Sequence, residues 1–359
     1  MPVHTQGSLL GGRYRVLRHL GSGGMASVLL CQDERLDRQV AVKRLHADSP
    51  ADVERRFVRE AKLGASLNHP NLVSVFDTVT DEESVLIVME HVDGENLADA
   101  LRRGPLGTDR AMSVIGDVAA ALDHAHSSGV IHRDIKPANV LLRKDGMTKL
   151  VDLGIATAAD QTKITRSGVV LGTAAYMAPE QIEGGTTGPH TDVYSLAVVA
   201  YEALSGKRAR TGRTPMEIAH QVATDGPPDL QEVWSQAPPA AAEVLCRGMA
   251  QDPDQRPQSA GELARELEEA LAGVEDTKPT RPGTGAAGAA AAGGAAAGAA
   301  APRTRRRTRP RTPRPSPSRP PPRSSPPPSR SSPRRPRRPR WAAATTPPRA
   351  RGSTPRHTA

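Results

Sequence analysis

The ten residues 131–140, IHRDIKPANV, limit the folds open to this chain more than any other segment. Ile131 and Val140 are apolar and suit burial as strand-like anchors, whereas the residues between them fit neither a strand nor an amphipathic helix. The polar residues in this middle part include Asp134, Lys136 and Asn139. Because chemistry on a phosphate needs a base, a cation and a metal ligand close together, the segment indicates a phosphate site. Its other parts must then lie elsewhere in the chain.

Charge is divided unevenly along the chain. Of the 48 Lys and Arg residues, residues 277–359 hold 19 Arg and one Lys with no Asp or Glu, which gives this segment a charge of +20. The preceding residues hold the other 28 basic residues and all 39 acidic ones, a net charge of −11. The overall charge of +9 therefore describes neither part. We expect an acidic globular domain followed by a very basic tail.

The segment after the globular part has the composition of a disordered chain. Residues 302–359 are rich in Arg, Pro, Ser and Thr, with Trp341 as the only aromatic. Such a segment cannot bury enough apolar surface to offset its conformational entropy. Residues 283–301 are uncharged and long enough to cross a bilayer, but they lack Leu, Ile, Val and Phe. We interpret 273–301 as a flexible Ala/Gly-rich linker and expect no transmembrane segment.

The beginning of the chain and the cysteines indicate an intracellular protein. The N-terminal residues lack the apolar core of a signal peptide. The two cysteines, Cys31 and Cys246, match no metal-binding or redox spacing. We therefore predict a reduced, cytoplasmic protein without disulfides.

Hydrophobic patterning predicts an α+β fold with a strand-rich first half and a helical second half. Short apolar runs predict strands over 14–20, 27–33, 39–45, 72–79 and 84–90. Helical spacing of Phe57, Ala61 and Ala65 predicts one helix in the first half, over 52–67. After Gly94 helices are predicted over 109–129, 192–206 and 259–273. The second of these is apolar on nearly all sides, which is typical of a helix buried in a large core.

Three features of the first half suit phosphate binding, although each is ordinary by itself. LGSGGMASV, residues 20–28, joins two predicted strands, and its glycines let backbone amides approach an anionic ligand. Lys43 ends the VAVK strand, and Glu60 on the next helix could pair with it. A glycine-rich hairpin is more often only a turn, and such a lysine is usually a surface charge. Their meaning depends on the motifs later in the chain.

Further motifs come after IHRDIKPANV in a fixed order. They are VDLG with Asp152, GTAAYMAPE at 172–180, DVYSL at 192–196 and DQRP at 254–257. With this set the chain resembles a bacterial eukaryotic-like (Hanks-type) serine/threonine protein kinase over roughly Tyr14 to Leu271. One such motif arises by chance, but seven in the right order do not, namely the glycine-rich loop, VAVK, the helical Glu, HRDIKPAN, DLG, APE and DQRP.

The resemblance implies a two-lobed protein kinase fold with a disordered tail. The implied kinase domain covers 14–272, with an N-lobe at about 14–90 and a C-lobe at about 93–272. Residues 1–13 are then an N-terminal extension.

The resemblance also assigns catalytic roles. Lys43, oriented by Glu60, would hold the α- and β-phosphates of ATP. Asp134 would accept the proton of the substrate hydroxyl, and Lys136 would neutralise charge on the γ-phosphate. Lys136, in the form Asp-x-Lys-Pro-x-Asn, indicates Ser and Thr rather than Tyr as the residues phosphorylated. The implied partners are therefore protein substrates that carry Ser or Thr.

The same resemblance implies a metal and nucleotide site. Asp152 and Asn139 would ligate Mg²⁺, with Mn²⁺ as an alternative ion. Backbone groups of Glu90 and Val92 would meet the adenine edge. The implied ATP-binding residues are Leu20, Gly21, Ser22, Gly23, Gly24, Met25, Ala26, Ser27, Val28, Ala41, Lys43, Met89, Glu90, Val92 and Leu141. Two positions depart from the family pattern, Ala26 in place of a third glycine and Leu153 in place of phenylalanine, but no group that contacts phosphate or metal is lost.

A regulatory role is predicted for the segment between Asp152 and Glu180. Arg133 places a cation where a phosphate on this segment could dock, and Thr165 and Ser167 are the expected autophosphorylation sites. A homodimer could serve that reaction. The residues expected to have structural or switching roles are Arg133, Thr173, Glu180 and Arg256.

Other functions remain open for parts of the chain. A pseudokinase that binds nucleotide without turnover is disfavoured, because Lys43, Asp134, Asn139 and Asp152 are all retained. The arginines of the tail could bind a polyanion non-specifically. Alternatively the tail has no function. Its composition, rich in Ala, Gly, Pro and Arg, is what GC-rich DNA encodes in almost any reading frame.

Overall fold

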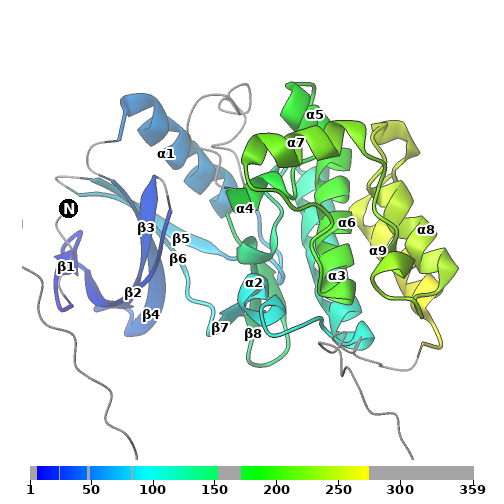
Figure 1. Cartoon of the computed structure of the whole chain (residues 1–359). Helices are drawn as coiled ribbons and strands as arrows, with labels where there is room; N and C mark the ends of the chain where they lie inside the picture. The colour runs from blue at the N-terminus through cyan, green and yellow to red at the C-terminus, as the bar shows by residue number, and fades with distance from the viewer. Residues whose placement is uncertain (1–5, 24, 47–48, 82–83, 153–170, 275–359) are drawn as a thin grey trace, which may run out of the picture. The chain divides into compact units, whose positions relative to one another are not determined.

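The computed structural model describes residues 6–23, 25–46, 49–81, 84–152 and 171–274. All of them belong to one unit of the chain, Met1–Gly288. This unit has a strand-rich N-lobe and a helical C-lobe (Figure 1), which confirms the predicted α+β fold. The predicted linker and tail fall outside the described residues, apart from Gly273 and Val274. None of the helices in the described ranges is long and apolar enough to cross a membrane.

The N-lobe is built on an antiparallel sheet in the order β1-β2-β3-β4-β6-β5. Its strands are β1 (Leu9–Leu10), β2 (Tyr14–Ser22), β3 (Ala26–Asp33), β4 (Arg38–Leu45), β5 (Val75–Asp81) and β6 (Ser84–Glu90). One face buries a cluster that includes Cys31, Val40 and Leu86, each with no exposed surface. Because side chains alternate along a strand, Lys43 of β4 points to the opposite face of the sheet, which a helix covers.

Helix α1 (Ala51–Ser66) covers that second face of the sheet (Figure 1). Phe57 and Ala61 are buried there, against Val85 and Ile87 of β6. The prediction that Ala65 shares this face is wrong, because Ala65 is exposed and Gly64 is buried instead. A Cβ atom at position 64 would lie 2.9 Å from Val75 Cγ2, so only glycine lets α1 approach β5 this closely.

Residues 7–12, interpreted from the sequence as part of an N-terminal extension, belong to the N-lobe sheet. The Gly7 amide donates to the Val16 carbonyl at 2.9 Å, and the Val16 amide donates to Ser8 at 2.8 Å. Leu10 is 2% exposed and lies in the same cluster as Tyr14 and Val16. The first strand therefore contributes to the core of the lobe.

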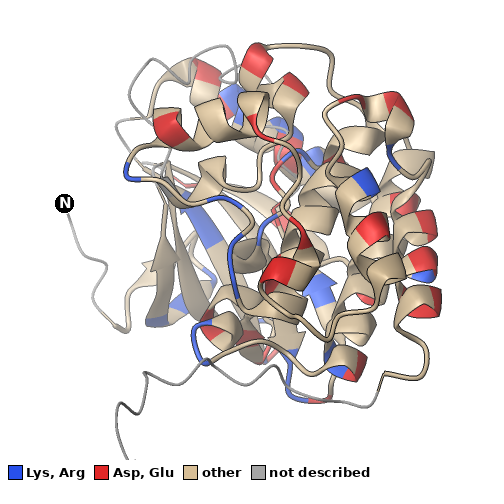
Figure 2. Ribbon diagram, turned by 45° about the vertical axis from the view of Figure 1, so that its right-hand side comes forward, with Lys and Arg blue, Asp and Glu red and all other residues tan. Residues whose placement is uncertain are grey.

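Short strands and helices link the lobes and form the C-lobe. The strands are β7 (Gly94–Asn96), β8 (Val140–Arg143) and β9 (Thr148–Leu150), which form a separate sheet in that order. The helices are α2 (Leu97–Leu101), α3 (Thr108–Ser127), α4 (Leu171–Ala174), α5 (Pro179–Glu183), α6 (Pro189–Ser205), α7 (Pro215–Thr224), α8 (Pro239–Gly248) and α9 (Ala260–Leu271). The 3₁₀ turns are η1 (Pro137–Asn139), η3 (Leu230–Glu232) and η4 (Pro253–Gln255). Figure 2 shows Asp and Glu positions spread over the helices of this lobe, with Lys and Arg among them.

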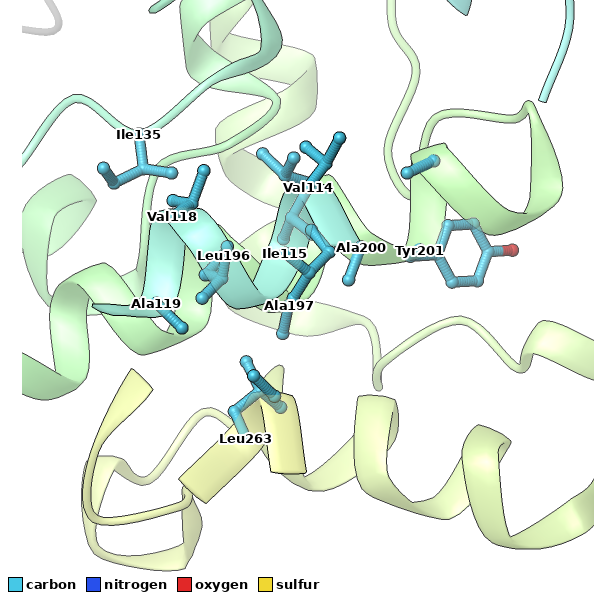
Figure 3. Close-up of a cluster of buried hydrophobic side chains, with 14 of the residues drawn as sticks. Val114, Ile115, Val118, Ala119, Ile135, Leu196, Ala197, Ala200, Tyr201 and Leu263 are labelled. Carbon is cyan, nitrogen blue, oxygen red and sulfur yellow. The ribbon is translucent and has the colours of Figure 1, made fainter. Parts of the chain in front are cut away.

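Helix α6 forms the centre of the C-lobe core. Every residue from Thr191 to Ser205 is buried, which confirms the burial predicted from its all-round apolar character. Its residues Leu196 and Ala197 pack with Val118 of α3 and Leu263 of α9 (Figure 3). Figure 3 also shows Ile135, which enters this cluster from the loop after α3. The loop that carries IHRDIKPANV is thus anchored in the largest core of the unit.

The strand predicted over 72–79 begins only at Val75. Before it, Leu72 forms a parallel bridge with Leu150 of β9. The Val73 amide donates to the Leu150 carbonyl at 3.0 Å, and the Leu150 amide donates to Asn71 at 2.8 Å. The residues between α1 and β5 therefore join the N-lobe to the sheet of the C-lobe.

The burial of Leu10 predicts that the first strand stabilises the domain. Leu10→Ala should lower the free energy of unfolding by about 2–5 kcal/mol, since it removes a buried side chain and leaves a cavity. Urea denaturation measures this. Leu9→Ala is the matched control, because Leu9 is 42% exposed, and it should change stability by less than about 0.5 kcal/mol. Equal stability of Leu10→Ala and the unmodified chain would show that residues 7–12 lie outside the folded domain.

Candidate active site

Lys43 joins the two lobes through a pair of carboxylates. Its Nζ lies 2.9 Å from Glu60 Oε1 on α1 and 2.8 Å from Asp152 Oδ1, which follows β9. The β4 register, with Lys43 opposite Val28 and Ile87, points the lysine to the side of the sheet covered by α1. Burial by itself would lower the pKa of Lys43, but Asp152 and Glu60 outweigh burial and raise it. The ammonium is therefore charged at any physiological pH.

Asp152 stays ionised beside this ammonium. Partial burial favours the neutral acid, but Lys43 outweighs this and holds the pKa of Asp152 below its usual value. Its backbone is in the left-handed region with φ of 57°, which is uncommon for a residue with a side chain. Such conformations occur where the surrounding structure holds a functional group in place.

The loop around Asp134 brings together a carboxylate, a cation and an amide. Lys136 Nζ lies 3.0 and 2.8 Å from the two carboxylate oxygens of Asp134. Asn139 Nδ2 donates to the Asp134 carbonyl at 2.8 Å and to its Oδ2 at 3.1 Å. Lys136 also donates to Thr173 Oγ1 at 3.3 Å, which ties this loop to the GTAAYMAPE segment. Asp134 therefore has its charge balanced and its side chain held from two sides.

A buried carboxylate on α6 fixes the backbone of this loop. Asp192 has no exposed surface. It accepts hydrogen bonds from the amide of His132 at 2.8 Å and from the amide of Arg133 at 2.7 Å. The ring of His126 on α3 lies 2.8 Å from the same carboxylate. Arg133 has φ of 66°, so the backbone turns sharply just before Asp134.

The anchors of the loop differ from those expected. Ile131 was predicted to be buried but is only half-buried, whereas Ile135 is 1% exposed and Val140 is fully buried. His132 is also fully buried, and its Nε2 lies 3.0 Å from the Val151 carbonyl. Hydrophobic and polar contacts thus alternate along the loop, leaving Asp134 and Lys136 partly exposed.

A cavity of about 460 Å³ opens between the strands of the N-lobe and the β8 region. This volume falls in the range of pockets that hold small ligands, about 300–1,000 Å³. Residues from the sequence prediction that line it are Leu20, Gly21, Val28, Ala41, Met89, Glu90, Val92, Asn139, Leu141 and Asp152. Lining residues that the prediction did not include are Arg18, Val73, His91, Asp93, Gly94, Glu95, Asn96, Asp99, Ala138 and Val151.

The glycine-rich segment forms the turn between β2 and β3. The Gly23 amide donates to the Ala26 carbonyl at 2.8 Å, and the His46 amide donates to Met25 at 3.0 Å. Ser22 and Ser27 are paired across the hairpin. The predicted ATP-binding residues of this turn that do not line the cavity are Ser22, Gly23, Met25, Ala26 and Ser27. Gly24 lies outside the described residues.

Lys43 and Met89 line a smaller cavity, which shares Met89 and Asp152 with the first one. Its volume is about 40 Å³, and Glu60 lines it as well. The lysine, the glutamate and the aspartate therefore meet next to the larger cavity.

The remaining residues with predicted structural roles lie in the C-lobe. Glu180 and Arg256 form a bidentate ion pair with both distances at 2.9 Å, and Arg256 is 2% exposed. Burial favours neutral Glu180, but Arg256 outweighs it and lowers the pKa of this carboxyl. Arg133 Nε donates to Thr187 Oγ1 at 3.0 Å. Thr165 and Ser167 lie outside the described residues.

Asp152 and Asn139 have the chemistry expected for a magnesium site. Asn139 Nδ2 donates to Asp134, and among the described residues its Oδ1 accepts no hydrogen bond. Asp152 uses Oδ1 for Lys43, and within the same described ranges its second carboxylate oxygen has no partner. Oxygen ligands of this kind suit Mg²⁺, which keeps waters and phosphate oxygens in its other positions. Among the described residues there is no cluster of three His, Cys, Asp or Glu side chains that would form a metal site by itself.

No role was predicted from the sequence for Asp192, although it begins the DVYSL segment. A charged residue in an otherwise apolar helix was the signal, since a buried charge needs partners. No role was predicted from the sequence for Val73, or for Val151 in the VDLG motif, and both line the cavity. Their place depends on the bridge between Leu72 and Leu150, which joins segments far apart in the sequence.

The protein kinase class is defined by the features described above. They are two lobes, a lysine held by carboxylates from both lobes, and a loop with Asp134, Lys136 and Asn139 at the edge of the 460 Å³ cavity. Residues 14–267 match the family described as protein kinase domain, and the chain belongs to this family. The family predicted from the sequence is therefore confirmed.

Curated relatives place the chain near bacterial members of the family. It is 38% identical over 269 residues to serine/threonine-protein kinase PrkC of Bacillus subtilis, which is 74% of this chain and 41% of PrkC. It is 40% identical over 267 residues to serine/threonine-protein kinase PknB of Mycolicibacterium smegmatis, covering 72% of this chain and 43% of PknB. It is 38% identical over 294 residues to serine/threonine-protein kinase PknA of Mycobacterium tuberculosis, which is 79% of this chain and 68% of PknA. The chain thus spans less than half the length of the first two.

The contacts of Asp192 predict that it is needed for an ordered catalytic loop. Asp192→Asn keeps the shape of the side chain but removes its charge and one acceptor, so stability should fall by about 1.5–3 kcal/mol. Misplacement of Asp134 should lower turnover about 10²-fold. Steady-state kinetics and denaturation measure both effects. Asp254→Asn, at an exposed position in η4, is the control, and unchanged turnover in Asp192→Asn would contradict the anchoring role.

Proposed function

We propose that this chain transfers the γ-phosphoryl group of Mg-ATP to Ser and Thr hydroxyls of proteins. The observation that carries the proposal is the contact of Lys136 with both oxygens of Asp134, in a loop that also carries Asn139. A base for the hydroxyl, a cation for the phosphoryl group and a metal ligand thus come from one short loop. The names of the relatives support serine and threonine as the acceptors.

The nucleotide would enter the cavity between the lobes. The adenine would lie between Val28 and Ala41 on one side and Leu141 on the other, all of which line the cavity. The Glu90 amide donates to Ser74 at 2.9 Å, so Glu90 has only its carbonyl to offer to the adenine. Within the described residues the Val92 amide has no protein acceptor and could donate to the ring.

The charged residues would act on the phosphates and on the hydroxyl. Lys43, fully charged and held by Glu60, would bind phosphate oxygens without proton loss. Mg²⁺ held by Asp152 and Asn139 would neutralise charge on the phosphates. Asp134 would take the proton of the substrate hydroxyl as the oxygen attacks the γ-phosphorus. Lys136 would stabilise the charge that develops on the transferred group, from its position beside Asp134.

An active kinase is favoured over a pseudokinase by the state of these groups. Lys43, Glu60 and Asp152 are in contact, and Asp134, Lys136 and Asn139 are in contact. In phosphoryl transfer the protein contributes chiefly positioning and charge, so a complete and connected set of charged groups is what activity requires.

Asp134→Asn tests the role of the base. It should lower phosphotransfer by about 10²–10⁴-fold, the usual contribution of general acid–base catalysis. The dissociation constant for ATP should stay within about twofold, because Asp134 does not line the nucleotide cavity. Phosphotransfer assays and calorimetry measure the two quantities. Asp145→Asn, at an exposed turn, serves as the control, and wild-type turnover in Asp134→Asn would show that another group is the base.

Autophosphorylation at Thr165 and Ser167 stays a prediction that accompanies this function. A phosphate adds about −1.5 to −2 charge and could pair with Arg133, which lies directly before Asp134. Mass spectrometry of the active protein beside Asp134→Asn should find phosphate at Thr165, with Ser167, only in the active form. Replacing both residues by Ala should lower activity without unfolding the domain. A fully active preparation without phosphate at either residue would refute the prediction.

Two further predictions about partners also stay open to test. Polyanion binding by the arginines of 302–359 should weaken steeply as salt rises. A homodimer that serves autophosphorylation would make the initial rate per molecule rise with protein concentration, whereas reaction within one molecule would leave it constant.

A further inference from the structure

Glu90 ends β6 and is the first residue of the segment that joins the lobes. Its side chain is 21% exposed and turns to basic residues of the C-lobe sheet. Oε2 accepts from Lys149 Nζ at 2.8 Å and from the Ser74 amide at 3.4 Å. Oε1 lies 3.8 Å from Arg143 Nη1. The carboxylate is therefore held by groups from both the β5–β6 region and the C-lobe sheet.

Lys149 is the most buried of these partners. Its side chain is 7% exposed, and Nζ also donates to the Leu72 carbonyl at 3.2 Å. A buried ammonium needs such partners, because leaving it unpaired is costly. The position of its charged end is therefore set by Glu90 and Leu72 together.

The backbone on both sides of Lys149 is held in place by hydrogen bonds. Leu150, the next residue of β9, exchanges backbone hydrogen bonds with Asn71 and Val73 at 2.8 and 3.0 Å. Asn71 Nδ2 donates to the Thr148 carbonyl at 2.9 Å. Residues on both sides of Lys149 are thus hydrogen-bonded to the segment before β5.

These contacts concern the same residue that meets the adenine in the proposed function. The Glu90 amide is bonded to Ser74, and the Glu90 carboxylate is bonded to Lys149. Within the described residues the amide and the carboxylate of Glu90 are thus occupied, and in the proposed function the Glu90 carbonyl would accept from the 6-amino group of adenine. Rotation of the peptide that carries this carbonyl is restrained by the anchored side chain and amide.

We propose that Lys149 is a positioning residue that fixes the Glu90 carbonyl for the 6-amino group of adenine and thereby favours ATP over nucleotides that lack this group. This inference rests on the proposed function. The alternative is that the Lys149–Glu90 pair only stabilises the fold. The two roles differ in one respect, since a structural role affects all nucleotides alike, whereas a positioning role affects only those with a 6-amino donor.

The test compares two nucleotides on the full chain. Calorimetry gives the dissociation constants of Mg-ATP and of Mg-purine riboside triphosphate, which lacks the 6-amino group. In Lys149→Met the dissociation constant of ATP should rise about tenfold, the worth of one well-placed hydrogen bond. That of purine riboside triphosphate should stay within about twofold of the unmodified chain. Turnover at saturating ATP should be unchanged, because Lys149 does not contact the reacting groups.

Two more variants keep the test decisive. Glu90→Gln keeps an oxygen acceptor but removes the negative charge that holds Lys149. It should therefore show the same selective loss of ATP affinity. This variant replaces Lys149→Met in the test if Lys149→Met does not fold. Lys207→Met is the control, because Lys207 is an exposed lysine of the C-lobe that does not line the nucleotide cavity. It should bind both nucleotides as the unmodified chain does.

The outcomes separate the inference from the proposed function. Unchanged ATP binding in folded Lys149→Met or Glu90→Gln would overturn the positioning role, and so would an equal loss for both nucleotides. If the unmodified chain binds neither nucleotide, the proposed function fails instead.

Discussion

A carboxylate without access to water has to be surrounded by donors, and Asp192 meets this requirement with the backbone of the catalytic loop itself. The amides of His132 and Arg133 and the ring of His126 all donate to it or lie within hydrogen-bond distance. Because Asp192 lies on the buried helix α6, these hydrogen bonds fix the loop to the closely packed core of the C-lobe. The loop can then take the left-handed turn at Arg133 that a free chain would avoid.

The rest of the site extends from this anchor. Gln181, at the start of α5, donates to the Arg133 carbonyl at 2.9 Å, so the APE segment is held to the same turn. Asn139 reaches back to Asp134, and Thr173 contacts Lys136. Across the cleft, Lys43 takes one carboxylate from each lobe. In the proposed site the charged groups are therefore held by buried polar contacts in the C-lobe and by Lys43 in the N-lobe, and Lys149 contacts Glu90 in the segment between the lobes.

Much of this could be predicted from the sequence, because local patterns carried the information. Strand alternation, the all-round apolar character of α6 and the order of the motifs depend on neighbouring residues. What could not be predicted depends on contacts between distant segments. Leu10 enters the N-lobe core through β1, Leu72 bridges to Leu150, and Glu90 turns to Lys149. Ile131 was expected to anchor the catalytic loop, but the anchor is Ile135, because the turn at Arg133 changes which side chain faces the core.

The central claim is that the cleft transfers the γ-phosphoryl group of ATP to hydroxyl side chains of proteins. The most direct measurement supplies the purified chain with Mg²⁺, a generic protein substrate and ATP radiolabelled either at the γ- or at the α-phosphoryl group, followed by phosphoamino acid analysis. The account predicts label on serine and threonine from γ-labelled ATP only. Label on tyrosine, label from α-labelled ATP, or release of phosphate to water without labelled protein would contradict it.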